Sequence, residues 1–385
     1  MEKRFVVFFV SLLQKLPKYV IIEDEITVRR KTAGGVTSMK ERKEELTLSE
    51  QEHRNGLQVL FNGVFVCTVF VWVLRFAFSG LLKLLAPKVD SYYLLTALSL
   101  LGDGLSVLLP FLLFHKVRRD PFRPIFSEKP RSEHPFLRCV MGVVSVFCLA
   151  VCAMMLVDFG LNLLESNGVH SAITRPDFGQ GKVQALYYVI LSTLIYSFCY
   201  ETAFRGIAVR AMKEENQTAA VLVSGLAFAF SDGEPHHVAV RLAVGFLLGW
   251  FYLRVRSVWA CMALHAAAQA AVCFAFRFSF DPLFESYLFF ICLVLGVSAA
   301  FFLFFPKKEK EPSVTSKGVS LRIVFTTFGV WVLAGLLAFN MMSFTFYMED
   351  APDLITPEHG QRDPLFNNPT DRAENIPNYQ ENMPD

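Results

Sequence analysis

Long apolar runs separated by short polar or basic segments repeat along most of this chain of 385 residues. A helix of about 20 apolar residues is long enough to cross the hydrocarbon core of a bilayer. Runs that approach or reach this length lie at about 57–80, 92–114, 136–164, 183–212, 218–232, 238–255, 257–276, 282–305 and 320–346. The pattern therefore predicts an all-α, polytopic membrane bundle of about eight or nine transmembrane helices.

Two of the runs, 218–232 and 238–255, are short and lie close together in the sequence. The segment between them, Asp232-Gly233-Glu234-Pro235-His236-His237, is polar and contains a turn signal. This break is compatible with two short spans or with a bent or re-entrant pair. The number of spans therefore stays open between eight and nine, by the usual length of about 20 residues for a span.

Composition agrees with a membrane location. Hydrophobic residues make up 53% of the chain and phenylalanine alone occurs 39 times, which excludes an ordinary soluble domain. All eight cysteines lie within apolar runs, so we expect them to pack as small hydrophobic side chains rather than to form disulfides.

Lysine and arginine are concentrated in segments that fall on one side of the membrane if the chain has about nine spans. These segments are 1–55, 116–131, 210–213, 254–256 and 307–310. Because short cytoplasmic loops carry such an excess, we expect the amino terminus inside and the carboxyl terminus outside. The basic loops are expected to contact anionic lipid headgroups, and nucleic acid is not an expected partner.

The same features divide the chain into consecutive regions. We expect a cytoplasmic segment at 1–55, amino-terminal spans with a basic loop at 56–182, a membrane core at 183–276, carboxyl-terminal spans at 277–346 and an acidic tail at 347–385. The tail is rich in Pro, Asn, Asp and Glu and poor in large apolar residues, so we expect it to be disordered.

Glu201 and Arg205 lie inside one of the most apolar regions, in Tyr200-Glu201-Thr202-Ala203-Phe204-Arg205-Gly206. An ionised side chain at the centre of a membrane helix costs on the order of 3 kcal/mol, so such residues persist mainly where they have a role. Residues four apart share a helix face. The pair is therefore either an ion pair that lets the helix tolerate its charges or part of a functional site.

Three further polar residues lie in the runs that follow: Asp232 ends one run, and His265 and Gln269 share a helix face in another. At about 1.5 Å per residue from the predicted cytoplasmic ends, Glu201 lies roughly 16 Å deep, Asp232 roughly 21 Å and His265 roughly 12 Å. They can therefore share one layer and bind a divalent metal, with a position left for water. The alternatives are a helix-terminating Asp232 before glycine and interhelical hydrogen bonding by His265 and Gln269.

At these residues the chain resembles the CPBP intramembrane metalloproteases, which include the type II CAAX prenyl endopeptidases and the bacterial Abi proteins. Glu201, Arg205 and Gly206 match the family's first motif, and Phe204 fills its aromatic position. The glycine-rich run 245–254, followed by Ser257-Val258-Trp259-Ala260 and His265, is similar to the family's approach to its last motif. The resemblance covers about 183–276.

The resemblance implies an endopeptidase that cleaves membrane-associated or lipidated polypeptides in a bacterial-type plasma membrane. It implies that Glu201, Asp232 and His265 bind a divalent metal, zinc by expectation. Glu201 would also act as the base. Arg205 and Gln269 would orient the cluster or stabilise the oxyanion.

The chain departs from the family pattern at three places: Tyr200 replaces the first glutamate, Asp232 a histidine and Gln269 an asparagine. Aspartate can still bind zinc and glutamine can still donate a hydrogen bond, but a phenol is a poor base near neutral pH. Two main functions therefore stay open: an active metalloendopeptidase, or a catalytically inactive member that binds a membrane peptide or protein partner. A transporter is a third.

Overall fold

The computed structural model describes residues 39–118, 124–127, 135–167, 169–171, 181–213, 216–231, 235–277 and 282–304, with residue 179 and short pieces between 331 and 348. Its helices are α3 (Met39–Leu85), η2 (Ala86–Lys88), α4 (Tyr92–Arg118), α5 (Pro124–Ser127), α6 (Pro135–Glu165), α7 (Lys182–Glu201), η3 (Thr202–Val209), α8 (Arg210–Met212), α9 (Gln217–Phe230), α10 (Pro235–Val255), α11 (Val258–Arg277) and α12 (Pro282–Phe304). Two short strands, β1 (Val169–Ser171) and β2 (Phe346–Met348), pair antiparallel. The predicted all-α polytopic bundle is confirmed.

Seven helical stretches in the described part are long and apolar enough to cross a membrane, and each corresponds to a predicted run. The run at 218–232 forms α9, which has 14 residues. At about 1.5 Å per residue this helix is about 21 Å long, shorter than the ~30 Å hydrocarbon core. The predicted run at 320–346 and the tail at 347–385 lie almost wholly outside the described residues.

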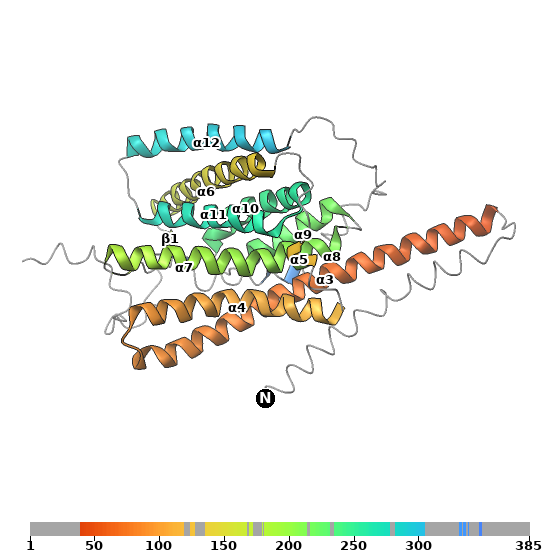
Figure 1. Cartoon of the computed structure of the whole chain (residues 1–385), viewed down its shortest axis with the longest axis horizontal. Helices are drawn as coiled ribbons and strands as arrows, with labels where there is room; N and C mark the ends of the chain where they lie inside the picture. The colour runs from red at the N-terminus through yellow and green to blue at the C-terminus, as the bar shows by residue number, and fades with distance from the viewer. Residues whose placement is uncertain are drawn as a thin grey trace, which may run out of the picture.

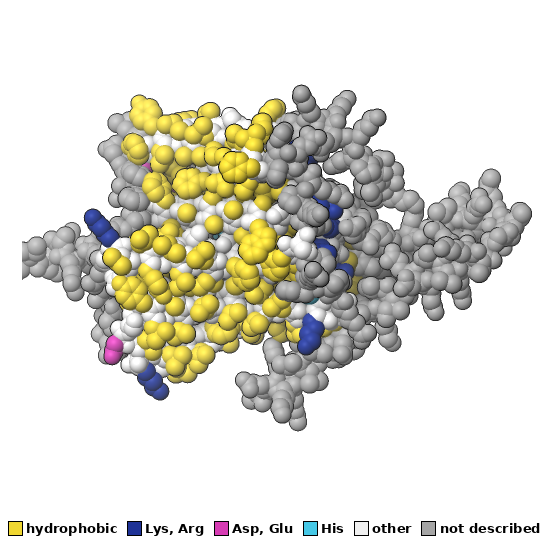
Figure 2. All heavy atoms as spheres, in the orientation of Figure 1, with side chains coloured by type: hydrophobic (Ala, Val, Ile, Leu, Met, Phe, Trp, Pro, Cys, Tyr) yellow, Lys and Arg dark blue, Asp and Glu magenta, His cyan; other side chains and the backbone are white. Residues whose placement is uncertain are grey.

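The long helices form a bundle in which neighbours lie side by side (Figure 1). Across the bundle, α12 packs on α6, α6 on α11, α11 on α7, α7 on α4 and α4 on α3. The short α9 packs against α10, η3 and α3. The face seen in Figure 2 is covered by hydrophobic side chains, with lysine and arginine near its two ends, as expected for helices that contact lipid.

Glycines bring α9 and α10 into close contact beside the polar residues of η3. A Cβ atom added at Gly245 of α10 would lie 3.2 Å from the Cα atom of Gly225 in α9 and 3.1 Å from the ring of Phe228. Small residues at such a crossing let two membrane helices approach closely. The approach matters for the site because it leaves the carbonyl oxygen of Gly245 within reach of Arg205.

Candidate functional site

The centre of the site lies where α7 continues directly into the π-helix η3. Glu201 is the last residue of α7, and every residue of η3 from Thr202 to Val209 is buried. π-helical segments are rare and are frequent at functional sites. A Cβ atom at Gly206 would lie 2.7 Å from the side chain of Ile125, so the absence of a side chain lets α5 pack against η3.

Glu201, Arg205 and His265 form a buried polar cluster between α7–η3 and α11. The Oε1 atom of Glu201 lies 2.8 Å from Nδ1 of His265 and 3.2 Å from Nη1 of Arg205. Glu201 and Arg205 have no exposed surface, and His265 is 5% exposed. Arg205 also donates from Nη2 to the carbonyl oxygen of Gly245, at 2.8 Å. These contacts supply the pairing that buried charges require.

Polar atoms of the cluster remain without a hydrogen-bond partner among the described residues. The Oε2 atom of Glu201 and the Nε atom of Arg205 are buried and make no hydrogen bond there. In its hydrogen bonds with described residues, His265 uses only the Nδ1 atom. When Nδ1 donates its proton to Glu201, the Nε2 atom keeps a lone pair. This is the arrangement in which a carboxylate orients an imidazole to bind a metal or to accept a proton.

Aromatic rings enclose the imidazole of His265. The ring of Tyr200 lies 5.6 Å away at 84°, and that of Phe228 lies 5.3 Å away at 69°, so both meet it edge to face. The guanidinium carbon of Arg205 lies 4.8 Å from the centre of the Phe228 ring. These contacts hold the imidazole and the guanidinium between aromatic rings.

A second polar network, contributed by α3, borders the cluster. Arg75 donates from Nη2 to the hydroxyl oxygen of Tyr200 and from Nη1 to the carbonyl oxygen of Ser231, at 2.9 Å. Trp72 donates from Nε1 to the carbonyl oxygen of Phe230, at 2.6 Å. Because these carbonyls end α9, α3 supplies donors and a positive charge at the carboxyl end of that helix.

The charge of Arg75 is balanced in part by α4. The Nε atom of Arg75 lies 3.8 Å from Oδ1 of Asp103, and the hydroxyl of Tyr196 donates to Oδ2 of Asp103, at 3.1 Å. The network thus joins α3, α4, α7 and the end of α9. Through Arg75, this network holds Tyr200, the residue next to Glu201. Arg75 and Asp103 belong to α3 and α4, which precede residues 183–276 in the chain.

The structure brings together Glu201, Arg205 and His265, three of the residues predicted for the site. Gln269 is half-buried, and its amide nitrogen lies 4.0 Å from the sulfur of Cys273 on the same helix; it makes no hydrogen bond to Glu201, Arg205 or His265. Asp232 lies outside the described residues. No group of three or more His, Cys, Asp or Glu side chains within the described residues is arranged to hold a metal.

Arg75 and Arg241 were not predicted as neighbours of the site. The guanidinium carbon of Arg241 lies 5.2 Å from the centre of the Tyr200 ring and 5.9 Å from that of Phe228. Both arginines lie within candidate membrane spans. A charged side chain in a membrane helix is energetically costly, and this makes the two arginines recognisable in the sequence.

Comparison with known proteins finds a match to one family model, over the segment that contains the cluster. Residues 182–271 match the family model described as type II CAAX prenyl endopeptidase Rce1-like. The chain matches no curated protein and no solved structure. The match begins with α7 and ends within α11, so it contains Glu201, Arg205 and His265. The resemblance seen in the sequence is thereby confirmed for this segment.

Proposed function

From this Rce1-like segment, we propose that the protein is an intramembrane endopeptidase that cleaves membrane-associated or lipidated polypeptides. The observation that carries the proposal is the 2.8 Å contact between Oε1 of Glu201 and Nδ1 of His265. This contact joins two candidate membrane spans inside the matched segment. A buried carboxylate and imidazole in direct contact are the groups that peptide hydrolysis needs to move a proton.

In the proposed reaction Glu201 is the base that accepts a proton from the attacking water. Its Oε1 atom holds His265 through Nδ1, so that the Nε2 atom keeps a lone pair for a ligand role. Glu201 can later return the proton to the leaving amine. Arg205 holds the carboxylate of Glu201 in place and retains a buried Nε–H. That N–H is the group that we propose to donate to the oxygen on which negative charge develops.

We propose that the site takes a divalent metal, with zinc as the expected ion. The two donor atoms that fit it are Oε2 of Glu201, which is buried without a hydrogen bond in the described part, and Nε2 of His265. Carboxylate and imidazole are ordinary zinc ligands. Asp232 stays the predicted third ligand. A bound zinc would polarise the scissile carbonyl and the attacking water.

Tyr200 supports a second candidate function, that of a catalytically inactive member that binds a peptide or protein partner. It stands where the family has its first glutamate, and its hydroxyl oxygen accepts a hydrogen bond from Arg75. A phenol whose oxygen is occupied in this way is a hydrogen-bond donor rather than a base. If catalysis has been lost, this substitution is the cause that we propose.

The protein is an integral membrane protein of the multi-pass type, with seven candidate spans in its described part. We propose a bacterial-type plasma membrane location, with the basic ends of the helices and the amino terminus on the cytoplasmic side and the carboxyl terminus outside.

The two functions are separated by assaying the purified full chain on a quenched fluorescent prenylated peptide. If the protein is an active endopeptidase, the wild type cleaves the peptide. The cleavage rate of Glu201→Gln is then lower by about 100-fold or more, the usual contribution of general acid–base catalysis. Cleavage by Tyr200→Glu but not by the wild type identifies the natural protein as a catalytically inactive member. The control is Ser192→Ala, which removes a buried hydroxyl from the same helix. Both proposed functions are contradicted if no variant cleaves the peptide and none binds it.

A further inference from the structure

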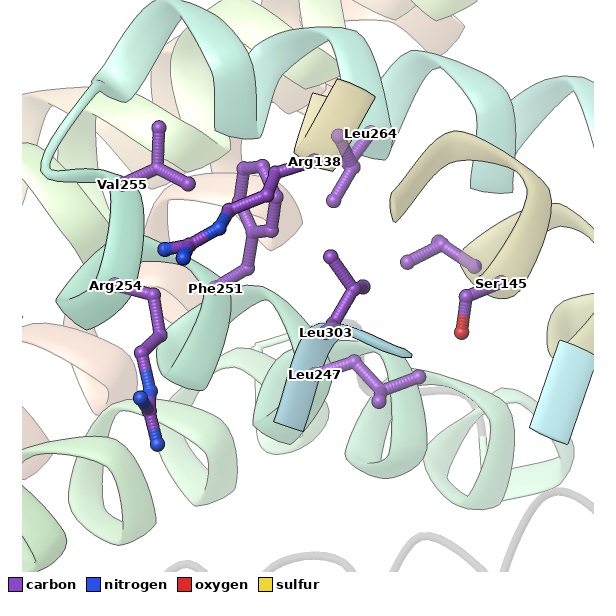
Figure 3. Close-up of a pocket in the computed structure, with 9 residues that line it drawn as sticks. Arg138, Ser145, Leu247, Phe251, Arg254, Val255, Leu264 and Leu303 are labelled. Atoms are coloured by element: carbon purple, nitrogen blue, oxygen red, sulfur yellow. The ribbon is translucent and has the colours of Figure 1, made fainter. Parts of the chain in front are cut away.

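A pocket separate from the Glu201–His265 cluster lies between α6, α10, α11 and α12 (Figure 3). None of the cluster residues lines it. Its lining is apolar apart from two arginines and one serine, and consists of Arg138, Ser145, Val146, Leu247, Phe251, Arg254, Val255, Leu264 and Leu303.

The two arginines lie at helix ends, where a membrane helix meets the headgroup region. Arg138 lies in the first turn of α6 and Arg254 in the last turn of α10. Both side chains are half-buried, and Figure 3 shows them on one side of the pocket, with Ser145 on the opposite side. The guanidinium of Arg254 makes no hydrogen bond or ion pair with any residue that the structure describes.

The remainder of the pocket offers almost no polar contact. The hydroxyl of Ser145 donates to the carbonyl oxygen of Gly296, at 3.1 Å, and is therefore already used. Phe251 and Leu264 are buried, whereas Leu303 is half-buried on α12. Next to Leu303, the exposed rings of Phe301 and Phe302 continue the apolar surface of α12.

A ligand that matches this lining has an anionic group at one end and a hydrocarbon chain at the other. Guanidinium groups bind phosphate through paired N–H donors, and basic pockets between membrane helices bind anionic headgroups. We infer that an anionic phospholipid binds at the lipid-facing mouth of this pocket, with its phosphate on Arg138 and Arg254 and its acyl chain on the outer surface of α12, beside Leu303 and the exposed rings of Phe301 and Phe302. A general excess of basic residues at the cytoplasmic ends does not by itself place two arginines beside an apolar pocket.

The inference does not depend on proteolysis and is tested by native mass spectrometry of the full chain in detergent. The protein is titrated separately with phosphatidylglycerol, phosphatidylcholine and inorganic phosphate. The expected result is binding of phosphatidylglycerol at least about tenfold tighter than phosphatidylcholine, as expected for charge-assisted contacts to phosphate. Inorganic phosphate is expected to bind more weakly because it gains nothing from the apolar lining.

Variants assign the lipid to this pocket. Changing Arg138→Gln and Arg254→Gln together is expected to weaken phosphatidylglycerol binding by about tenfold or more, and the matching lysine pair to retain most of it. Leu303→Trp, which fills the apolar part, is expected to weaken it as well. Lys116→Gln is the control, because it removes an exposed charge from the carboxyl end of α4, away from the pocket.

Three results overturn the inference. The first is equal binding of phosphatidylglycerol and phosphatidylcholine, and the second is a loss in Lys116→Gln as large as in the double arginine variant, which indicates surface charge alone. The third is unchanged binding in Leu303→Trp with full competition by inorganic phosphate, which indicates an anion site that does not hold a lipid chain. If the double glutamine variant does not fold, it is replaced by the double lysine variant combined with Leu303→Trp. This variant keeps both positive charges and tests the contact with the acyl chain.

Discussion

The strongest quantitative prediction concerns the buried ion pair of Glu201 and Arg205. Replacing Glu201 by Gln removes the charge that faces a guanidinium with no exposed surface. Two unit charges about 4 Å apart attract by about 4 kcal/mol at an effective dielectric constant of 20, and breaking a buried pair costs about 3–5 kcal/mol. Arg205 keeps its hydrogen bond to Gly245 and its contact with Phe228, so we expect the lower end, about 3 kcal/mol.

The complementary change, Arg205→Met, leaves Glu201 with His265 as a partner, 2.8 Å away. We therefore expect a smaller loss of about 2 kcal/mol. Together, Glu201→Gln and Arg205→Met leave no unpaired charge, and the double variant is expected to lose only about 2 kcal/mol. The sum of the losses in the two single variants then exceeds the loss in the double variant by a coupling energy of about 3 kcal/mol.

The measurement is the free energy of unfolding of the full chain in mixed micelles, with SDS as denaturant and helicity followed by circular dichroism. Ser192→Ala is the control, because its hydroxyl donates to a carbonyl one turn away and contacts neither Glu201 nor Arg205, and it is expected to cost less than about 1 kcal/mol. Additive losses in the double variant, or a loss in Glu201→Gln no larger than that of the control, refute a buried ion pair at this position.

The remaining predictions concern the surroundings of the cluster. Arg75→Met removes donors to Tyr200 and Ser231, and we expect it to cost about 2 kcal/mol in the same unfolding measurement; a loss below that of Ser192→Ala contradicts the network. Gly245→Ala places a methyl group 3.2 Å from the Gly225 backbone, so we expect about 1–3 kcal/mol of destabilisation, against no loss in Gly160→Ala, where space is open. Incubation with a zinc chelator is expected to abolish peptide cleavage, and added zinc to restore it; cleavage that survives complete removal of metal contradicts the proposed metal.

The membrane fold could be predicted from the sequence because lipid imposes a simple requirement on it. Each span must satisfy its backbone polar groups by hydrogen bonds within its own helix and must present apolar side chains to the lipid. A helix that does both appears in the sequence as a continuous apolar run. The run at 218–232 was less informative, because its apolar residues lie in the 14-residue helix α9, which packs against α3, α10 and η3. Hydropathy alone does not distinguish such a packed short helix from a span.

Part of the candidate site could also be predicted. Glu201 and Arg205 were identified because charges in an apolar helix are costly, and the spacing of four placed them on one face. The depth argument put His265 in the same layer, and the two side chains are in direct contact. The same spacing placed Gln269 on the face of His265, yet its amide contacts Cys273, because spacing alone does not determine which neighbour a flexible side chain reaches.

The parts that could not be predicted depend on how distant helices pack. Arg75 contacts Tyr200 across 125 positions of sequence, and nothing in α3 alone indicates that partner. The π-helix η3 also has no clear local signal, because its sequence from Thr202 to Val209 is compatible with an ordinary α-helix. Both features involve packing between segments distant in the sequence: α3 meets α7 at Tyr200, and η3 packs against α4 and α9.

The most direct test of the central claim is the rate at which the purified full chain cleaves a prenylated peptide, measured for the wild type, His265→Ala and Ser192→Ala. If Glu201 and His265 form the hydrolytic site, the wild type and Ser192→Ala cleave at similar rates, and His265→Ala loses about 100-fold or more. Cleavage by His265→Ala at the rate of the wild type would contradict the assignment of this cluster as the active site.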